Sequence, residues 1–389
     1  GKVGNDNFGD NVRFPYMYTI GSGGGYQWAD YNYDKNFGGK IYTDLASNNV
    51  TWEIATKHDI GVDLSLFNDK FTATIDYFHE QRDGIYMTRD HLSSMIGLNG
   101  KRPKANVGSV LSEGFDGNFA YKQKVGDVNL TIRGNMTYSK NEILERDEAY
   151  NVYEYQMDEG HRVDQAKGLI ALGLFKDYDD IRNSPRQDFG SVQPGDIKYK
   201  DINGDGIIDS YDKVRGVGHP KVPEIVYGFG LNIEYKGFYA SAFFQGAGNC
   251  SVLLGGNTPE GWFPFSWGVD QSNYRTFALD RWTEKNPSQN VLMPRLHKDN
   301  TNAANNSVAS TWWLRNGGFL RLKNVELGYQ LPKKLLSKIN LQAARIYLMG
   351  YNIALWDDLK YFDPEAGNAN GGNTYPKART FTLGIDFTF

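Results

Sequence analysis

The last part of the chain, Arg379–Phe389, alternates strictly between two kinds of side chain. The apolar members share one parity: Phe381, Leu383, Ile385, Phe387 and Phe389. The positions between them are small or polar: Thr380, Thr382, Gly384, Asp386 and Thr388. Because successive side chains of a β-strand point to opposite faces, the pattern predicts a strand with one apolar and one wet face. Its length suits a tilted strand that crosses a bilayer, although a strand of a soluble sandwich would alternate in the same way.

The same alternation recurs upstream in four pairs of segments, each pair joined by a short link. The pairs are Glu53–Phe67 with Lys70–Glu80, Phe115–Val125 with Val128–Tyr138, Ile225–Tyr235 with Phe238–Gln245, and Phe319–Leu331 with Ala344–Leu355. Long segments at about 84–105, 141–222, 246–318 and 356–375 separate the pairs from one another and from the final strand. Residues Gly1–Asn49 are polar and glycine-rich, which predicts loop.

Short and long connections therefore alternate along the chain. A soluble sandwich has no reason to place its long loops on one side, whereas an outer-membrane barrel has short periplasmic turns and long extracellular loops. Backbone groups in lipid must all be paired, so such strands close into a barrel. The predicted fold class is all-β, a transmembrane antiparallel β-barrel. The nine predicted strands are an odd number, so either one strand is missed or the chain is the C-terminal part of a larger barrel; its loop-like start favours the larger barrel.

Composition and charge exclude several classes of function. A net charge of −4 without a basic block argues against nucleic-acid binding. The longest clearly apolar run, Leu169–Phe175, is too short for a transmembrane helix. The single cysteine, Cys250, cannot form an internal disulfide. No Ser-His-Asp signature or nucleophile elbow is present, and carboxylates are common in barrel lumens, so we do not expect an enzyme.

Several motifs carry a resemblance to a known family. They are Asn49–Glu53, Pro194–Gly206, Phe319–Tyr329, Phe362–Glu365 and the closing strand, and together they span nearly the whole chain. The sequence resembles the C-terminal barrel portion of SusC-like (RagA-type) TonB-dependent outer-membrane transporters of Bacteroidota. The resemblance implies that residues 1–389 supply the last strands of a 22-stranded barrel in the outer membrane, and that the plug domain is absent from this chain.

The resemblance also implies a function for the whole protein. It implies active import of a nutrient, usually an oligosaccharide (glycan) and sometimes a peptide, through a barrel embedded in the lipid bilayer. A SusD-like surface lipoprotein would act as a lid, and TonB would supply energy through a missing N-terminal region. The alternative is a passive outer-membrane pore or a surface-attachment barrel without TonB-driven transport.

An acidic loop at 201–212 has the spacing of a calcium-binding loop. Such loops place oxygen ligands at positions 1, 3, 5, 7, 9 and 12 and glycine at position 6. The matching residues are Asp201, Asn203, Asp205, Ile207 through its carbonyl, Asp209, Asp212 and Gly206. We therefore expect a structural Ca²⁺ that holds a long loop in place. Position 12 is Asp rather than the usual Glu, so it can bind through one oxygen. The alternative is a solvated acidic turn.

Tryptophans in the long segment 246–318 are candidate ligand contacts. Aromatic rings can stack on sugar rings, and the candidates are Trp262, Trp267, Trp312 and Trp313. Rings of this kind also pack a long loop onto itself or face a partner protein, and the sequence leaves these alternatives open.

Overall fold

The computed structural model describes residues 1–5, 14–28, 35–93, 95, 101–254, 276–297, 300–336, 341–366, 375 and 377–388. Within these ranges, no helix has the length and apolar character needed to cross a membrane. The chain divides into two compact units. The first comprises Gly1–Ile60, Phe78–Gly114 and Lys140–Val163, and the second comprises Gly61–Tyr77, Phe115–Ser139 and Asp164–Phe389.

The main sheet has ten strands, in the order β1-β4-β5-β6-β7-β14-β15-β18-β19-β20. Their bounds are β1 (Lys2–Asn5), β4 (Glu53–Leu66), β5 (Phe71–Thr88), β6 (Lys104–Val125), β7 (Val128–Glu145), β14 (Ile225–Tyr235), β15 (Phe238–Gly248), β18 (Phe319–Gln330), β19 (Ala343–Asp357) and β20 (Thr380–Thr388). All nine predicted strands are present, and the all-β antiparallel class is confirmed. β5, β6 and β7 are longer than predicted, because backbone pairing continues where the side chains no longer alternate.

The first unit contains strands that the sequence pattern did not predict. β1 pairs antiparallel with residues 53–56 of β4 and supplies the tenth strand of the sheet. β2 (Thr19–Trp28) and β3 (Lys35–Asp44) form a separate hairpin. The first unit also holds a short 3₁₀-helix, η2 (Glu154–Gln156). The prediction of loop for Gly1–Asn49 is therefore wrong at these strands, since a glycine-rich segment can still pair through its backbone.

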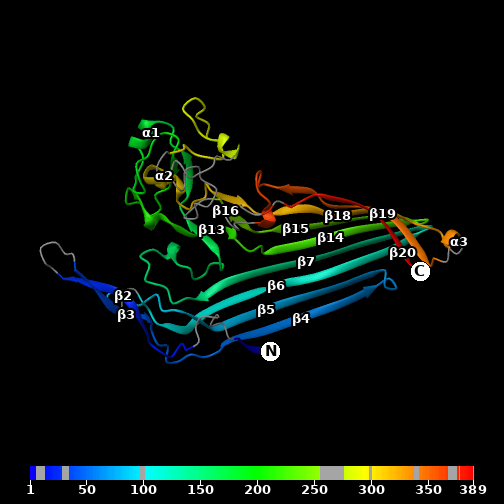
Figure 1. Ribbon diagram of the computed structural model, residues 1–389, viewed down its shortest axis with the longest axis horizontal. Helices are drawn as coiled ribbons and strands as arrows, with labels where there is room; N and C mark the ends of the chain where they lie inside the picture. Colours follow the sequence, from blue (N-terminus) through cyan, green and yellow to red (C-terminus); the bar gives the residue numbers. More distant parts are fainter. Residues whose placement is uncertain are drawn as a thin grey trace. The chain divides into compact units, whose positions relative to one another are not determined.

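In the second unit, β14, β15, β18, β19 and β20 lie side by side (Figure 1). The β14–β15 turn and α3 (Lys333–Leu336), which lies between β18 and β19, are at one end of these strands. The long connections gather at the other end, where Figure 1 shows α1, α2, β13 and β16. The short and long connections of this unit are thus on opposite sides, as the alternating lengths predicted.

Turn geometry explains how tightly the strands of one hairpin are joined. Lys236 and Gly237, which link β14 to β15, have φ values of 49° and 91°. Two consecutive residues with positive φ produce a turn whose twist matches that of the flanking strands. The register then runs without a break from Tyr235 opposite Phe238 to Ile225 opposite Gly248.

The long connections of the second unit fold into what we term the loop subdomain, residues 164–222, 250–254, 276–316 and 358–366. Its elements are β8 (Gln165–Gly168), β9 (Ala171–Leu174), α1 (Tyr178–Arg182), β10 (Arg186–Gln187), β11 (Ile197–Tyr199), β12 (Ile207–Ile208), η3 (Ser210–Asp212), β13 (Val214–Pro220), β16 (Ser251–Leu253), η4 (Thr276–Leu279), α2 (Asn300–Ser307), β17 (Leu314–Asn316) and η6 (Pro364–Ala366). Side chains from all of these segments share one buried core, which includes Leu169, Tyr199, Phe277, Trp313 and Leu359. The subdomain is therefore a packed body rather than a set of independent loops.

Candidate functional site

One face of the sheet in the second unit carries rows of apolar side chains. Leu383 of β20 lies opposite Leu348 of β19, which lies opposite Leu327 of β18. All three are exposed, and Leu383 reaches 75% exposure. Contact with water costs about 25 cal/mol per Å² of apolar surface. Such rows therefore favour a lipid environment, and their alternation with polar residues is typical of the outer face of a membrane barrel.

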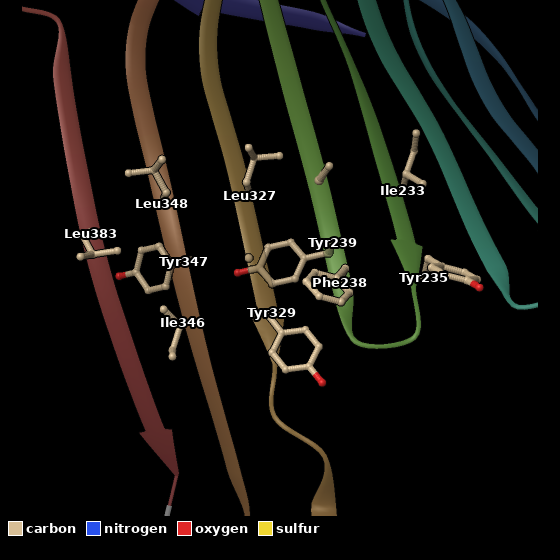
Figure 2. A pocket seen from close by; sticks show the side chains of 12 residues that line it. Ile233, Tyr235, Phe238, Tyr239, Leu327, Tyr329, Ile346, Tyr347, Leu348 and Leu383 are labelled. Atoms are coloured by element: carbon tan, nitrogen blue, oxygen red, sulfur yellow. The ribbon is translucent and has the colours of Figure 1, made fainter.

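A hollow of about 610 Å³ lies on this apolar face beside the β14–β15 turn. Figure 2 shows the rings of Tyr235, Phe238 and Tyr329 at its turn end, with the hydroxyls of both tyrosines directed away from Leu327. The small residue Ala240, between Ile233 and Leu327, leaves space in the wall. Aromatic residues with polar tips are typical of the boundary between hydrocarbon and water in membrane barrels.

The opposite face of the same strands carries a polar network. The Tyr239 hydroxyl donates to Glu326 Oε1 at 2.6 Å. Arg345 donates from Nε to Asp386 at 2.7 Å and from one Nη to Glu326 at 3.3 Å. A Cβ built on Gly328 would overlap the ring of Tyr239, so glycine at this position lets the tyrosine lie flat across β18. The two faces of the sheet are thus chemically distinct, one apolar and one charged.

Buried amides join α2 to β11 inside the loop subdomain. Asn306 accepts the Ile197 N–H at 2.9 Å and donates to Asp196 Oδ1 at 2.8 Å and to the Arg295 carbonyl at 3.0 Å. His297 Nε2 lies 2.6 Å from the same Asp196 oxygen. Buried carboxylates cost free energy unless they are hydrogen-bonded, and Asp196 accepts hydrogen bonds from Asn306 and from the Gln193 N–H.

Asp180 and Tyr199, which contact β11 or its neighbours in the loop subdomain, have shifted pKa values. The Lys198 ammonium donates to Asp180 at 2.8 Å and holds the pKa of that carboxyl below its usual value. Burial raises the pKa of Tyr199, whose hydroxyl donates to the Asn305 carbonyl at 2.8 Å. Both groups fix the packing of β11 against its neighbours rather than facing an open cavity.

The acidic loop 201–212 folds around its own backbone. Asp201 accepts the N–H groups of Gly204 and Gly206 at 2.7 and 2.9 Å. The buried Asp212 accepts those of Ile202 at 2.7 Å and Asp209 at 2.9 Å. Gly204 and Gly206 have φ values of 77° and 83°, a region that favours glycine.

Further contacts of the same loop place its remaining candidate residues. Asn203 accepts the Asp205 N–H at 3.1 Å, and Asp205 accepts the Ile207 N–H at 2.8 Å. Asp209 accepts the Tyr211 N–H at 2.7 Å and begins η3. Among the described residues, no three His, Cys, Asp or Glu side chains converge as a ready-made metal site. A carboxylate oxygen that accepts one N–H keeps a second lone pair, so the residues present remain compatible with a cation.

The structure separates the four candidate tryptophans. Trp313 is 1% exposed in the core of the loop subdomain, where its indole N–H donates to the Asn306 carbonyl at 2.7 Å. Trp313 thus belongs to the core of the subdomain, and its contact with a ligand stays a prediction. Trp312 is half-buried against the same core and donates to the Leu292 carbonyl at 3.3 Å, and its contact with a ligand stays a prediction. Trp262 and Trp267 lie outside the described residues.

Comparison with known proteins gives a consistent set of relatives. No family model matches the chain. TonB-dependent receptor P26 of Formosa agariphila is 28% identical over 365 residues, which cover 88% of this chain and 35% of that protein. TonB-dependent receptor SusC of Bacteroides thetaiotaomicron is 22% identical, over 100% of this chain and 37% of that protein. The chain thus spans just over a third of the length of these relatives.

Solved structures support the fold. A structure described as that of the RagAB peptide transporter matches with a TM-score of 0.71 and 21% identity, over 100% of this chain and 40% of that chain. The RagAB peptide importer in its open-open state matches with a TM-score of 0.70. At this identity the match establishes the barrel architecture and nothing about the ligand. In sequence the chain is similar to TonB-dependent receptors, SusC among them, and its architecture is that of an outer-membrane transporter barrel.

Proposed function

We propose that the whole receptor imports a nutrient across the outer membrane with energy supplied by TonB. Support comes from the sequence relatives. These are TonB-dependent receptors, and their similarity extends over 88 to 100% of this chain. The observation that carries the proposal is the two-faced sheet, with apolar rows on one side and the Tyr239–Glu326–Arg345 network on the other. A wall of this kind separates lipid from a polar lumen.

The finer parts of the proposal concern ligand and partners. The nutrient is an oligosaccharide or a peptide, and a SusD-like surface lipoprotein captures it at the loop subdomain. Support for this class of partner comes from the relative named SusC and from the RagAB architecture. The receptor changes no covalent bond of its cargo, since its described relatives are receptors and transporters rather than enzymes.

Whole-cell uptake tests this function. Cells that produce the full-length receptor, receptor-deletion cells and cells without TonB are given fluorescein-labelled malto-oligosaccharides or a fluorescein-labelled peptide mixture. We expect one ligand class to accumulate only with both receptor and TonB present, and the accumulation to stop when a protonophore collapses the proton gradient. Accumulation that needs the receptor but not TonB would make it a passive pore. Surface binding without accumulation would make it an attachment barrel.

We also propose that the loop 201–212 binds a structural Ca²⁺. Support comes from the oxygen spacing and from the positive φ of Gly204 and Gly206, which brings successive oxygens around a tight turn. β12 pairs with β10 in parallel, which anchors the middle of the loop to the subdomain. A cation would offset the repulsion among Asp201, Asp205 and Asp209.

Metal analysis of the purified receptor tests the calcium proposal. We expect about one Ca²⁺ to be lost on extensive chelation, and protease cleavage within 201–212 to become faster. Asp201→Asn should lower the calcium content of the receptor. The matched control Asp188→Asn changes an exposed carboxylate outside the loop and should leave the content unchanged. Equal metal content and equal cleavage before and after chelation would exclude the site.

A further inference from the structure

A second cavity lies within the loop subdomain, away from the sheet. Its volume is about 360 Å³, within the range of about 300 to 1,000 Å³ of small-molecule sites. Its apolar wall includes Leu254 and Leu359, which are buried in the subdomain core, and Val291, which packs against that core. Because this wall belongs to a packed core, the cavity is preformed.

Arg315, on β17, lines one side of this cavity. One Nη of Arg315 donates to the carbonyls of Trp312 and Leu314 at 2.6 and 2.9 Å, which fixes the orientation of the group. Among the described residues no carboxylate forms an ion pair with this arginine, and burial lowers its pKa. Arginine nevertheless stays protonated in proteins. A partly desolvated cation that contacts only carbonyls gains free energy when a carboxylate joins it.

Carboxylates form other parts of the same wall. Asp280 follows η4, and its backbone N–H donates to the Phe277 carbonyl at 3.0 Å, which fixes its position. Asp358 accepts a hydrogen bond from Asn316 at 2.9 Å. Lys360 lies 5.7 Å from the ring centre of Tyr361, so its charge is held near the aromatic wall. The cavity therefore combines positive groups, negative groups and an apolar surface.

This combination selects one class of ligand. A neutral sugar would leave the charge of Arg315 without a counterion, and an acidic sugar, which has no cationic group, would leave Asp280 and Asp358 unpaired. A ligand with one ammonium, one carboxylate and an apolar side chain satisfies all three parts of the wall.

We propose that this cavity binds a short peptide with free ends, its carboxylate paired with Arg315 and its ammonium with Asp280 and Asp358. A leucine-like side chain would pack against Leu254 and Val291. For its biological use, the inference rests on the proposed import function, because a peptide held in the loop subdomain would be cargo in the course of capture. Binding itself is measured without transport.

Isothermal titration of the full-length receptor, purified in detergent, tests the proposal with the dipeptide Ala-Leu. We expect one binding event that weakens at least about tenfold when both ends of the dipeptide are blocked by N-acetylation and C-amidation. Arg315→Gln should weaken binding of the free dipeptide to a similar extent. Asp280→Asn, which preserves the size of the side chain, should weaken it by about threefold to tenfold.

Control variants separate this cavity from general surface charge. Arg182→Gln and Asp179→Asn alter exposed residues on α1 outside the cavity and should leave the dipeptide affinity unchanged. If Arg315→Gln disturbs the fold by losing its carbonyl contacts, the Asp280→Asn result decides alone.

Other outcomes would overturn the inference. Equal affinities for free and blocked dipeptides would exclude recognition of the ends. Binding of maltotriose or trigalacturonate that Asp280→Asn or Arg315→Gln alters would assign the cavity to a sugar instead. TonB-dependent uptake without any dipeptide binding would refute the peptide site and leave the proposed import function standing. Dipeptide binding without uptake would refute the import function and leave the peptide site standing.

Discussion

Removal of the Asn306 side chain should loosen the loop subdomain without disturbing the sheet. Asn306 is 4% exposed and joins α2 to β11 through the Ile197 N–H, the Asp196 carboxylate and the Arg295 carbonyl. In Asn306→Ala the Ile197 N–H loses its acceptor inside the core. A buried polar group without a partner costs about 1 to 3 kcal/mol. Asp196 keeps two further hydrogen-bond partners, so we expect the free energy of opening of the loop subdomain to fall by about 3 kcal/mol in total.

Hydrogen–deuterium exchange of the full-length receptor measures this loss. A decrease of about 3 kcal/mol in the opening free energy corresponds to exchange about 100-fold faster at residues 196–199. Amides of β14 and β15 should keep their wild-type rates. The matched control Asn183→Ala changes an exposed asparagine of the same subdomain and should alter exchange by less than about threefold. Exchange at 196–199 within about threefold of wild type in Asn306→Ala would refute the assigned role of this amide network.

Two further variants test other contacts. Gly328→Val places a side chain where the Tyr239 ring lies, so it should break the hydrogen bond between Tyr239 and Glu326. The barrel should then unfold at a lower temperature, as measured by electrophoresis in detergent. An unchanged unfolding temperature would contradict the close contact between Gly328 and Tyr239. Lys198 lowers the pKa of Asp180 in the folded protein. The ion pair therefore stabilises the fold at pH values above the usual carboxyl pKa of about 4, and this stabilisation is lost as pH falls through the pKa that Asp180 has in the folded protein. Proteolysis at α1 should therefore accelerate below about pH 4 in wild type and depend less on pH in Lys198→Met; equal pH profiles would exclude the pair.

The sheet was predictable because one physical requirement repeats along it. A face that contacts lipid needs an apolar side chain at every second position, and β14 shows this from Tyr227 to Tyr235. Its predicted bounds agree with the structure. β1 was missed because four residues are too few for an alternation to be recognised, and its position depends on pairing with β4.

The loop subdomain was much less predictable. The contacts of Asn306 join residues that are 109 and 110 positions apart in sequence, and no local pattern indicates which carbonyl or N–H an asparagine will reach. Arg315 likewise carries no motif, since the role proposed for it depends on carbonyls of its own turn and on Asp280, which lines the same cavity. The acidic loop was recognisable because its residues are close in sequence, and its cation stays a prediction.

The assignment of the two sheet faces can be tested directly along one strand. Single cysteines at Leu231, Asn232, Ile233 and Glu234 of β14 would carry spin labels in a cysteine-free full-length receptor reconstituted in lipid. We expect high accessibility to oxygen, which dissolves in the bilayer, at Leu231 and Ile233, and low accessibility at Asn232 and Glu234. A profile with a period of two residues would establish that this strand separates lipid from a polar interior. Equal accessibility at all four positions, or the reverse pattern, would contradict the membrane-barrel assignment on which the proposed import depends.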